Sequence, residues 1–377
     1  PRVAPMPAAL AAGAAPAHTV EPPSPSSDDL SGGAMQPIED PSGRALESFF
    51  QALARTEDGG DGAVTRVLHY GDSMLTGDAI TGAARRLFQK RFGDAGHGFV
   101  LPGRPWPWYS HQGVRHGGSK GWDGYRLTSN PLIDGCLGLG GVAFTSIRPG
   151  ARFTVEPDEG GVVARFEVFY FAHPRGGRLR VDIDDREGAE LATRSDARES
   201  RYYAIDVPPG SHRIVIHNAG AGQVRVFGVS VERRGPGVLY DSLGVNGLHA
   251  SNFLRYSEEH LVDQVSHREP HLIAIMLGTN ESQNRHLKME KHGEDYAAML
   301  SRIRAGAPDA SCLVMSPPDR AARTRSGRMV TRPVIPRIVE RQRAVARAEG
   351  CAFFNTFEAM GGEGSAARWR GQRPVLM

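Results

Sequence analysis

The stretch "VTRVLHYGDSMLTGDAITGAARRLFQKRFG", residues 64–93, reads as a strand, a turn and a helix. Its first seven residues, Val64–Tyr70, form a short apolar run that is typical of a buried strand. After the turn, apolar residues recur on one helix face, at Ile80, Ala84, Leu87 and Phe88. Gly93 is placed to end that helix. Ser73 therefore lies at a strand-to-helix turn, and in an open parallel sheet such turns form the edge where ligands bind.

The bulk composition describes a globular chain. Its 377 residues are enough for about two domains. The hydrophobic fraction of 40% supplies material for cores, and no run of about 18 consecutive apolar residues is present, so we expect no membrane-spanning helix. The formal charge is +3, with Lys and Arg scattered rather than clustered. This pattern gives no indication of nucleic-acid binding.

The first 37 residues differ from the rest of the chain. They begin with Pro1, are rich in Ala, Pro and Ser, and bury too little apolar surface to offset the entropy of ordering. We interpret residues 1–37 as a flexible linker. Our hypothesis is that it followed a signal peptide or a membrane anchor, which makes the protein extracytoplasmic, meaning periplasmic, cell-surface or secreted. The alternative is a cytosolic protein with a ragged tail.

The pattern changes twice further along the chain. Between Cys136 and Arg233 come short segments of alternating hydrophobicity, separated by Gly, Pro and Asp, which is typical of a β-sandwich. Helical and strand patterns then alternate again, as in a doubly wound α/β domain. We therefore predict one α/β domain over residues 38–104 and 235–377, interrupted by a β-sandwich insert over residues 105–234.

Three short motifs follow predicted strands of the α/β domain. The first is Gly71-Asp72-Ser73, the second is "YDSLGVNGLHASN" over residues 240–252, and the third is "MLGTNES" over residues 276–282. Each motif alone is an ordinary turn. Their order, each one directly after a strand, favours a shared site at the carboxyl edge of the sheet.

In these motifs the chain resembles the SGNH (GDSL-type) hydrolase superfamily. The usual block III reads Gly-x-Asn-Asp, and this chain has Glu281 in place of the final Asp. In this respect the chain is similar to the branch that contains bacterial peptidoglycan O-acetylesterases. That branch carries a carbohydrate-binding-like β-sandwich between blocks I and II, which suits the 174 residues from Ser73 to Gly247 (247 − 73). The resemblance implies an α/β fold, a flavodoxin-like three-layer domain with an inserted jelly-roll-like β-sandwich.

The resemblance also implies the chemistry of acyl transfer. Ser73 would be the nucleophile, and the Ser73 N–H, the Gly247 N–H and the Asn280 side chain would form the oxyanion hole. Gly247 is preferred to Gly244 because the family's donor usually sits at the second glycine of this turn. The alternatives are a helix cap for Ser73 and a plain turn residue for Asn280.

Three further residues, Gly71 and Asp72 of block I and Glu281 of block III, are given supporting roles. Gly71 permits a close approach of the backbone, and Asp72 is expected to brace the turn rather than react. Glu281 is expected to support the block III turn without taking part in the chemistry.

The histidine and aspartate that would activate the serine are missing from the sequence. The family places them in an Asp-x-x-His motif near the C-terminus, and none of the 14 histidines fits it. We expect this motif beyond Met377; the alternative is a degenerate enzyme that only binds. His111 and His116 could lie near a glycan, or they could be ordinary surface-loop histidines.

An aromatic loop follows the first α/β segment. Trp106, Trp108, Tyr109 and Trp122 are candidate glycan contacts, because aromatic faces stack on sugar rings. The equally weighted alternative is a small core between the sandwich and the α/β domain.

The three cysteines match no metal-binding spacing, and we expect neither a metal nor another cofactor. Cys312 and Cys351 each begin a predicted strand. We favour two buried free thiols over a disulfide between them.

The sequence thus predicts a serine esterase that removes O-acetyl groups from a polysaccharide, such as peptidoglycan or another cell-surface glycan. One alternative is a glycan O-acetyltransferase that uses the same acyl-enzyme. Another is a glycan-binding protein with an inactive esterase domain.

Overall fold

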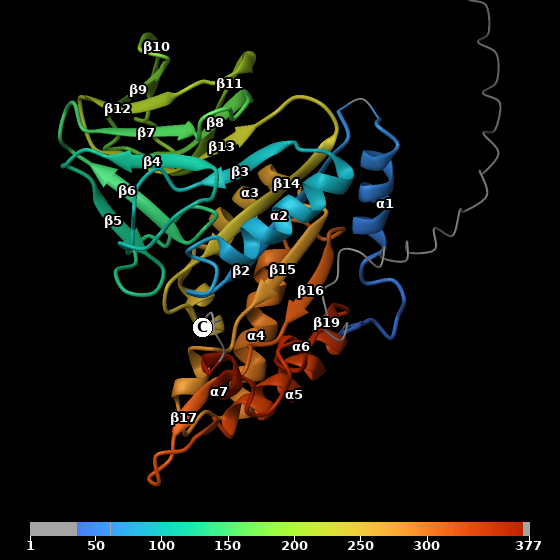
Figure 1. Ribbon diagram of the computed structural model, residues 1–377. Helices are drawn as coiled ribbons and strands as arrows, with labels where there is room; N and C mark the ends of the chain where they lie inside the picture. The colour runs from blue at the N-terminus through green and yellow to red at the C-terminus, as the bar shows by residue number, and fades with distance from the viewer. Residues whose placement is uncertain (1–35, 61, 372–377) are drawn as a thin grey trace, which may run out of the picture. The chain divides into compact units, whose positions relative to one another are not determined.

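The computed structural model describes residues 36–60 and 62–371 (Figure 1). All but the last two residues of the predicted linker, 1–37, lie outside these ranges, as does the chain beyond Gly371. No helix within the described ranges is long and apolar enough to cross a membrane.

A six-stranded sheet forms the centre of the α/β domain. Its strands, in spatial order, are β1 (Ile38–Glu39), β19 (Ala352–Phe354), β16 (Ser311–Met315), β15 (Leu272–Met276), β2 (Val64–Gly71) and β14 (Gly237–Gly244). All neighbours are parallel except β1, which is antiparallel to β19. Numbered along the chain, the five parallel strands have the order 2-1-3-4-5, which is the flavodoxin-like arrangement. The predicted fold class is confirmed.

Helices cover both faces of this sheet. One face carries α1 (Glu47–Glu57) and α2 (Ala79–Phe92), and the other carries α3 (Glu258–Arg268), α4 (Met289–Arg304) and α5 (Val334–Ala348). Successive strand residues point to opposite faces, so Val67 packs under α1 while Leu68 joins the core under α4. Burial on both faces explains why these strands read as nearly continuous apolar runs.

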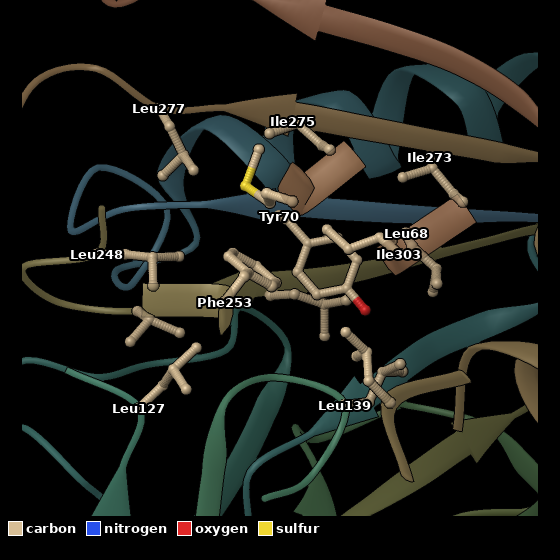
Figure 2. Close-up of a cluster of buried hydrophobic side chains, with 14 of the residues drawn as sticks. Leu68, Tyr70, Leu127, Leu139, Leu248, Phe253, Ile273, Ile275, Leu277 and Ile303 are labelled. Carbon is tan, nitrogen blue, oxygen red and sulfur yellow. The ribbon is translucent and has the colours of Figure 1, made fainter. Parts of the chain in front are cut away.

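The core under α4 reaches the loops at the carboxyl edge of the sheet. Figure 2 shows Tyr70 of β2 beside Phe253 of the short helix η1 (Ala250–Arg255), with Leu248 of the block II loop next to them. All three side chains are buried to 1% exposure or less. Packing in this core therefore holds the block II loop in place.

Two antiparallel sheets form a sandwich between α2 and β14. One has the order β11 (Glu199–Gly210), β8 (Val163–Ala172), β13 (Val224–Glu232), β6 (Val142–Ser146), β5 (Asp123–Arg126). The other has the order β10 (Arg186–Ala192), β9 (Arg178–Ile183), β12 (Ile214–Gly220), β7 (Arg152–Pro157), β4 (Val114–Gly118). A buried core contains side chains from both sheets. In addition, β3 (Gly96–Val100) pairs with β13, so pairing with this sandwich begins before residue 105, where the insert was expected to start.

Helix α3 connects the sandwich to the α/β sheet. The Tyr202 ring of β11 stacks on His267 with centroids 3.4 Å apart. The buried Arg268 donates from Nε to Asp241 of β14 at 2.6 Å and from Nη1 to Glu232 of β13 at 2.8 Å. Because Asp241 also accepts the Phe99 N–H of β3 at 2.8 Å, one carboxylate ties the two parts of the fold together.

The expectation of free thiols at Cys312 and Cys351 is wrong, because the two residues form a disulfide with Cα atoms 4.7 Å apart. Strands β16 and β19 are parallel neighbours with Leu313 opposite Ala352, so each cysteine lies one residue before a paired position. Cys136 is the free cysteine, and it is buried.

Short elements complete the described chain. They are η2 (Glu281–Gln283), β17 (Ala321–Arg323), β18 (Met329–Thr331), α6 (Thr356–Ala359) and α7 (Ser365–Arg370). The β17–β18 hairpin was not predicted from the sequence.

Candidate active site

Ser73 lies in a turn that is longer than the sequence suggested. Strand β2 ends at Gly71 and α2 begins at Ala79, so Ser73 does not cap the helix, and that alternative is wrong. Asp72 accepts the Met74 N–H on Oδ1 at 3.0 Å, which is the bracing role expected for it. The Ser73 side chain is exposed, and its backbone N–H donates to no group in the described residues.

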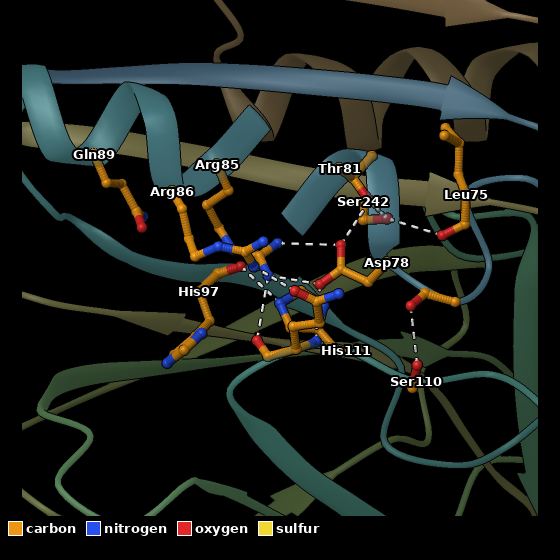
Figure 3. Close-up of polar contacts among 12 residues, drawn as sticks. Leu75, Asp78, Thr81, Arg85, Arg86, Gln89, His97, Ser110, His111 and Ser242 are labelled. Atoms are coloured by element: carbon orange, nitrogen blue, oxygen red, sulfur yellow. Dashed lines mark hydrogen bonds and ion pairs between the residues drawn. The ribbon is translucent and has the colours of Figure 1, made fainter. Parts of the chain in front are cut away.

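A buried polar network holds the far end of this turn (Figure 3). Asp78 binds Arg85 at 2.6 Å, accepts the Thr81 hydroxyl at 2.5 Å and accepts the Gln112 N–H at 2.8 Å. Its own backbone is left-handed, with φ of 54°. Such a conformation costs free energy in a non-glycine residue, and the surrounding bonds offset that cost. The network therefore fixes where the turn leaves the sheet edge.

The aromatic loop packs against the same turn. The Ser110 N–H donates to the Thr76 carbonyl at 3.2 Å, and the Ser110 hydroxyl donates to the Gly77 carbonyl at 3.1 Å (Figure 3). Trp106 and Tyr109 in this loop are each only 5% exposed.

The proposed glycan contact is therefore wrong for Trp106 and Tyr109, whose rings belong to the core between the sandwich and the sheet. The Tyr109 hydroxyl accepts the Leu101 N–H at 3.0 Å, which fixes its ring inside. Trp108 is 55% exposed, and Trp122 lines a groove on the sandwich. Loop residues can form a core when two layers meet over them, and no periodic pattern reports this.

Block II follows β14, which lies directly beside β2. Gly244 pairs with Gly71, and a Cβ on Gly244 would come within 2.8 Å of the Leu75 backbone, so this glycine serves close packing. Gly247 differs, because its φ is +75° and a Cβ there would meet nothing within 4 Å. Its N–H donates to no group in the described part of the chain. The geometry favours Gly247 over Gly244 as a donor to a ligand.

Block III follows β15, on the other side of β2. The Asn280 Nδ2 donates to the Leu248 carbonyl at 3.0 Å, so block III holds the block II loop. An amide nitrogen carries two hydrogens, which leaves one for a ligand. Thr279 donates from Oγ1 to the Met74 sulfur at 3.8 Å, which connects block III to block I. Asn280 thus does more than form a turn.

Glu281 is the residue whose environment the sequence did not indicate. Its carboxyl is buried, accepts the Ala250 N–H on Oε1 at 3.0 Å and has no hydrogen-bond partner on Oε2. The nearest ionisable nitrogen, His249 Nδ1, is 3.9 Å from Oε2. Burial raises the pKa of Glu281 to about 7. A neutral carboxyl is therefore abundant at this position near neutral pH, and its role is to hold the second loop.

The three loops meet at the carboxyl ends of three adjacent strands, β14, β2 and β15. Gly71 lies between Gly244 and Met276 in the sheet, and its carbonyl accepts the Val245 N–H at 2.9 Å. The Ser73 and Gly247 N–H groups, the Asn280 side-chain amide and the exposed Ser73 hydroxyl thus all belong to loops at this one edge. This set of donors suits an oxygen that gains negative charge during a reaction.

A base for the serine is not found among the described residues, where no histidine nitrogen lies within hydrogen-bond distance of the Ser73 hydroxyl. His111 is 3% exposed and has Nε2 3.1 Å from the His97 carbonyl, so it is neither a glycan contact nor a surface-loop residue. His116 is half-buried on the sandwich. The Asp-x-x-His motif expected beyond Met377 lies outside the described residues. Within those residues, no cluster of three side chains could hold a metal ion.

Comparisons with known proteins agree with this arrangement. Residues 209–373 match the model of the GDSL-like Lipase/Acylhydrolase family, a range that contains blocks II and III but not Ser73. The resemblance to the SGNH (GDSL-type) hydrolases is therefore confirmed for this part of the chain. No curated protein matches the sequence.

Among solved structures, a peptidoglycan O-acetylesterase is similar over 89% of this chain and 90% of its own, with 22% identity and a TM-score of 0.76. At this identity the match shows the fold and nothing about activity. A family two carbohydrate esterase from Clostridium thermocellum, in complex with cellohexaose, has 10% identity, covers 60% of this chain and 84% of its own, and has a TM-score of 0.26. A likeness this weak supports no conclusion.

Proposed function

We propose that this protein is a serine esterase that removes O-acetyl groups from a cell-surface polysaccharide such as peptidoglycan. The observation that carries the proposal is the meeting of Ser73, Gly247 and Asn280 at one edge of the sheet, with donor groups unused by the protein. The family match and the fold of the similar O-acetylesterase support it.

The reaction would proceed through an acyl-serine. The Ser73 oxygen attacks the acetyl carbon while a base takes its proton, and the carbonyl oxygen becomes an oxyanion that the three donors stabilise. Collapse breaks the ester bond, and the sugar oxygen leaves with the proton. Water then attacks the acetyl-serine, which releases acetate and restores the hydroxyl. The base and its aspartate partner are proposed to lie in an Asp-x-x-His motif beyond Met377.

The disulfide supports a location outside the cytoplasm. Disulfides persist in oxidising compartments and are rare in the cytosol, and Cys312 and Cys351 form one in the described chain. This agrees with the proposal that the protein is periplasmic, cell-surface or secreted, where a polysaccharide substrate would be found.

The test compares ester turnover with serine labelling. The longest product of the gene is given p-nitrophenyl acetate, and a second sample is treated with a fluorophosphonate probe. We expect turnover and labelling at Ser73, and a loss of at least about 10³-fold in kcat for Ser73→Ala, because the nucleophile is gone. Ser326→Ala, an exposed serine in the turn between β17 and β18, is the matched control and should react normally.

A folded protein that neither turns over the ester nor labels at Ser73 would reject the esterase. That result would favour the alternative function, a glycan-binding protein with an inactive esterase domain. Transfer of acetyl to an added glycan acceptor, in place of acetate release, would identify the acetyltransferase.

A further inference from the structure

A groove crosses one side of the sandwich, where the edge strand of each sheet lies. A cavity of about 590 Å³ runs along β4, where His116–Ser119 line it, and reaches β5 at Gly124 and Arg126. Strand β4 ends the order of one sheet and β5 ends the order of the other. We refer to it as the β4–β5 groove.

Aromatic rings and glycines build the floor of the groove. Trp122 stacks on Phe153 with centroids 4.2 Å apart. A Cβ on Gly118 would lie 2.5 Å from the Phe153 ring, and one on Gly103 would lie 2.8 Å from the Phe144 ring. The backbone at these glycines therefore lies directly on the rings. Phe153 and Phe144 are buried under these contacts and support the half-buried Trp122, whose ring can accept the apolar face of a sugar.

Polar atoms along the groove lack partners in the described protein. His116 Nδ1, Trp122 Nε1 and Arg126 Nε are all buried and make no hydrogen bond. Leaving a buried polar atom without a hydrogen-bond partner is unfavourable, and three such atoms lie beside this one groove. A hydroxyl-bearing ligand that enters the groove offers partners for them after small side-chain adjustments.

The charge of the groove is positive. Arg104 and Arg126 line it and form no ion pair with any described residue. No acidic side chain is among the described residues that line it. Arg126 is held by its own bond from Nη1 to the Pro105 carbonyl at 2.7 Å, so its guanidinium is positioned in advance. Guanidinium groups arranged this way bind carboxylates well.

Short segments connect the groove to the serine edge. Arg126 is two residues from Thr128, whose hydroxyl donates to the Asn246 carbonyl of block II at 3.0 Å. A two-residue segment spans at most roughly 7 Å. On the other side, Pro105 is five residues from Ser110, which bonds to Gly77 of the block I turn. The groove therefore lies within reach of an oligosaccharide that occupies the Ser73 edge.

We propose that the β4–β5 groove binds the same glycan strand that is deacetylated at Ser73, and that it recognises a carboxylate carried by that strand. The statement that the bound strand is deacetylated at Ser73 rests on the proposed function. Arg126 and Arg104 bind the carboxylate, and Trp122, supported by Phe153, contacts a sugar ring.

The experiment uses soluble O-acetylated peptidoglycan fragments with free carboxylates, and the same fragments after their carboxylates are converted to amides. Binding is measured on the full-length Ser73→Ala protein, which cannot consume the ligand. We expect at least 10-fold tighter binding of the carboxylate form at low salt, and loss of this preference in Arg104→Ser and Arg126→Gln. Arg325→Ser, an exposed arginine on the β17–β18 hairpin, is the matched control.

Turnover of p-nitrophenyl acetate by the same arginine variants, with Ser73 intact, reports on folding and on the esterase independently. It should equal that of the parent, because this small ester does not reach the groove. Equal binding of both ligand forms by the parent, no binding of either form, or an unchanged preference in both arginine variants would overturn the proposal. Carboxylate-dependent binding without any ester turnover would support glycan binding in the groove and would reject the proposal that Ser73 deacetylates the bound strand.

Discussion

The serine edge and the β4–β5 groove differ in how strongly side-chain bonds hold the loops around them. At the edge, Asp78 makes three short polar contacts, and Asn280 and Glu281 each bond to the block II loop. In the groove, His116, Trp122 and Arg126 keep buried polar atoms without protein partners. Both regions keep groups free for a ligand, but only at the edge do buried side-chain bonds fix the loops that carry those groups. Changes at the edge should therefore cost stability and rate, and changes in the groove should cost binding alone.

The largest effect is expected for Asp78→Ala. It removes the partner of Arg85, whose side chain is 4% exposed, and leaves a buried charge uncompensated. We expect the free energy of unfolding in urea to fall by about 3–5 kcal/mol. Asp78→Asn should lose less, because asparagine keeps hydrogen bonds and tolerates the left-handed backbone. An alanine variant as stable as the parent would show that the edge is not held by this network.

Asn280→Ala should affect the reaction more than the fold. Loss of one oxyanion donor lowers kcat by about 10²–10³-fold, and loss of the bond to the Leu248 carbonyl adds to the displacement of Gly247. Steady-state kinetics on p-nitrophenyl acetate give the value. Gln51→Ala, which removes an exposed amide on α1, is the control. Full activity in Asn280→Ala would remove this residue from the oxyanion hole.

Removing the disulfide, which is remote from both regions, should lower stability without changing catalysis or glycan binding. Replacing Cys312 and Cys351 by alanine opens a loop with a sequence separation of 39 residues, and the free energy of unfolding should fall by about 3 kcal/mol. Below the unfolding transition, ester turnover and glycan binding should stay at parental values. A loss of either at full folding would show that the two regions depend on the far side of the sheet.

The smallest effect concerns pH and Glu281. Its pKa is raised from 4.5 to about 7 in the folded protein, so the folded state binds more protons than the unfolded state between these values. Stability should therefore fall as pH rises from 4.5 through 7, by on the order of 1–3 kcal/mol. Glu281→Gln, which keeps an oxygen for the Ala250 N–H, should flatten this slope in urea titrations at several pH values. An identical slope in both proteins would place the titration elsewhere.

The sequence predicted the serine edge well because its information is local. Ser73, Gly247 and Asn280 each come directly after an apolar strand, and parallel strands bring their carboxyl ends to one edge. What the sequence did not predict depends on which elements become neighbours. Cys312 and Cys351 pair because β16 lies beside β19, a fact of sheet order rather than of either strand.

Other misses have the same origin in tertiary packing. Trp106 and Tyr109 lie in a segment with no helical or strand period, so their burial could not be derived from a pattern. Strand β3 lies within residues 38–104, which were assigned to the α/β domain, yet it pairs with β13 of the sandwich. Glu281 is a charged residue in a loop, and nothing in its neighbours along the chain indicates that η2 turns its carboxyl inward.

The pairing of β2 with β14 has a consequence for how the protein is made. Gly71 and Gly244 are partners although 173 residues (244 − 71) separate them, and β15, the other neighbour of β2, comes later still. At about 5–20 residues per second, a ribosome needs roughly 9–35 seconds to make that stretch. The central strand therefore waits without a partner on either side while the sandwich emerges. Pulse-labelled hydrogen exchange during synthesis should show protected amides in β8 and β13 before any in β2.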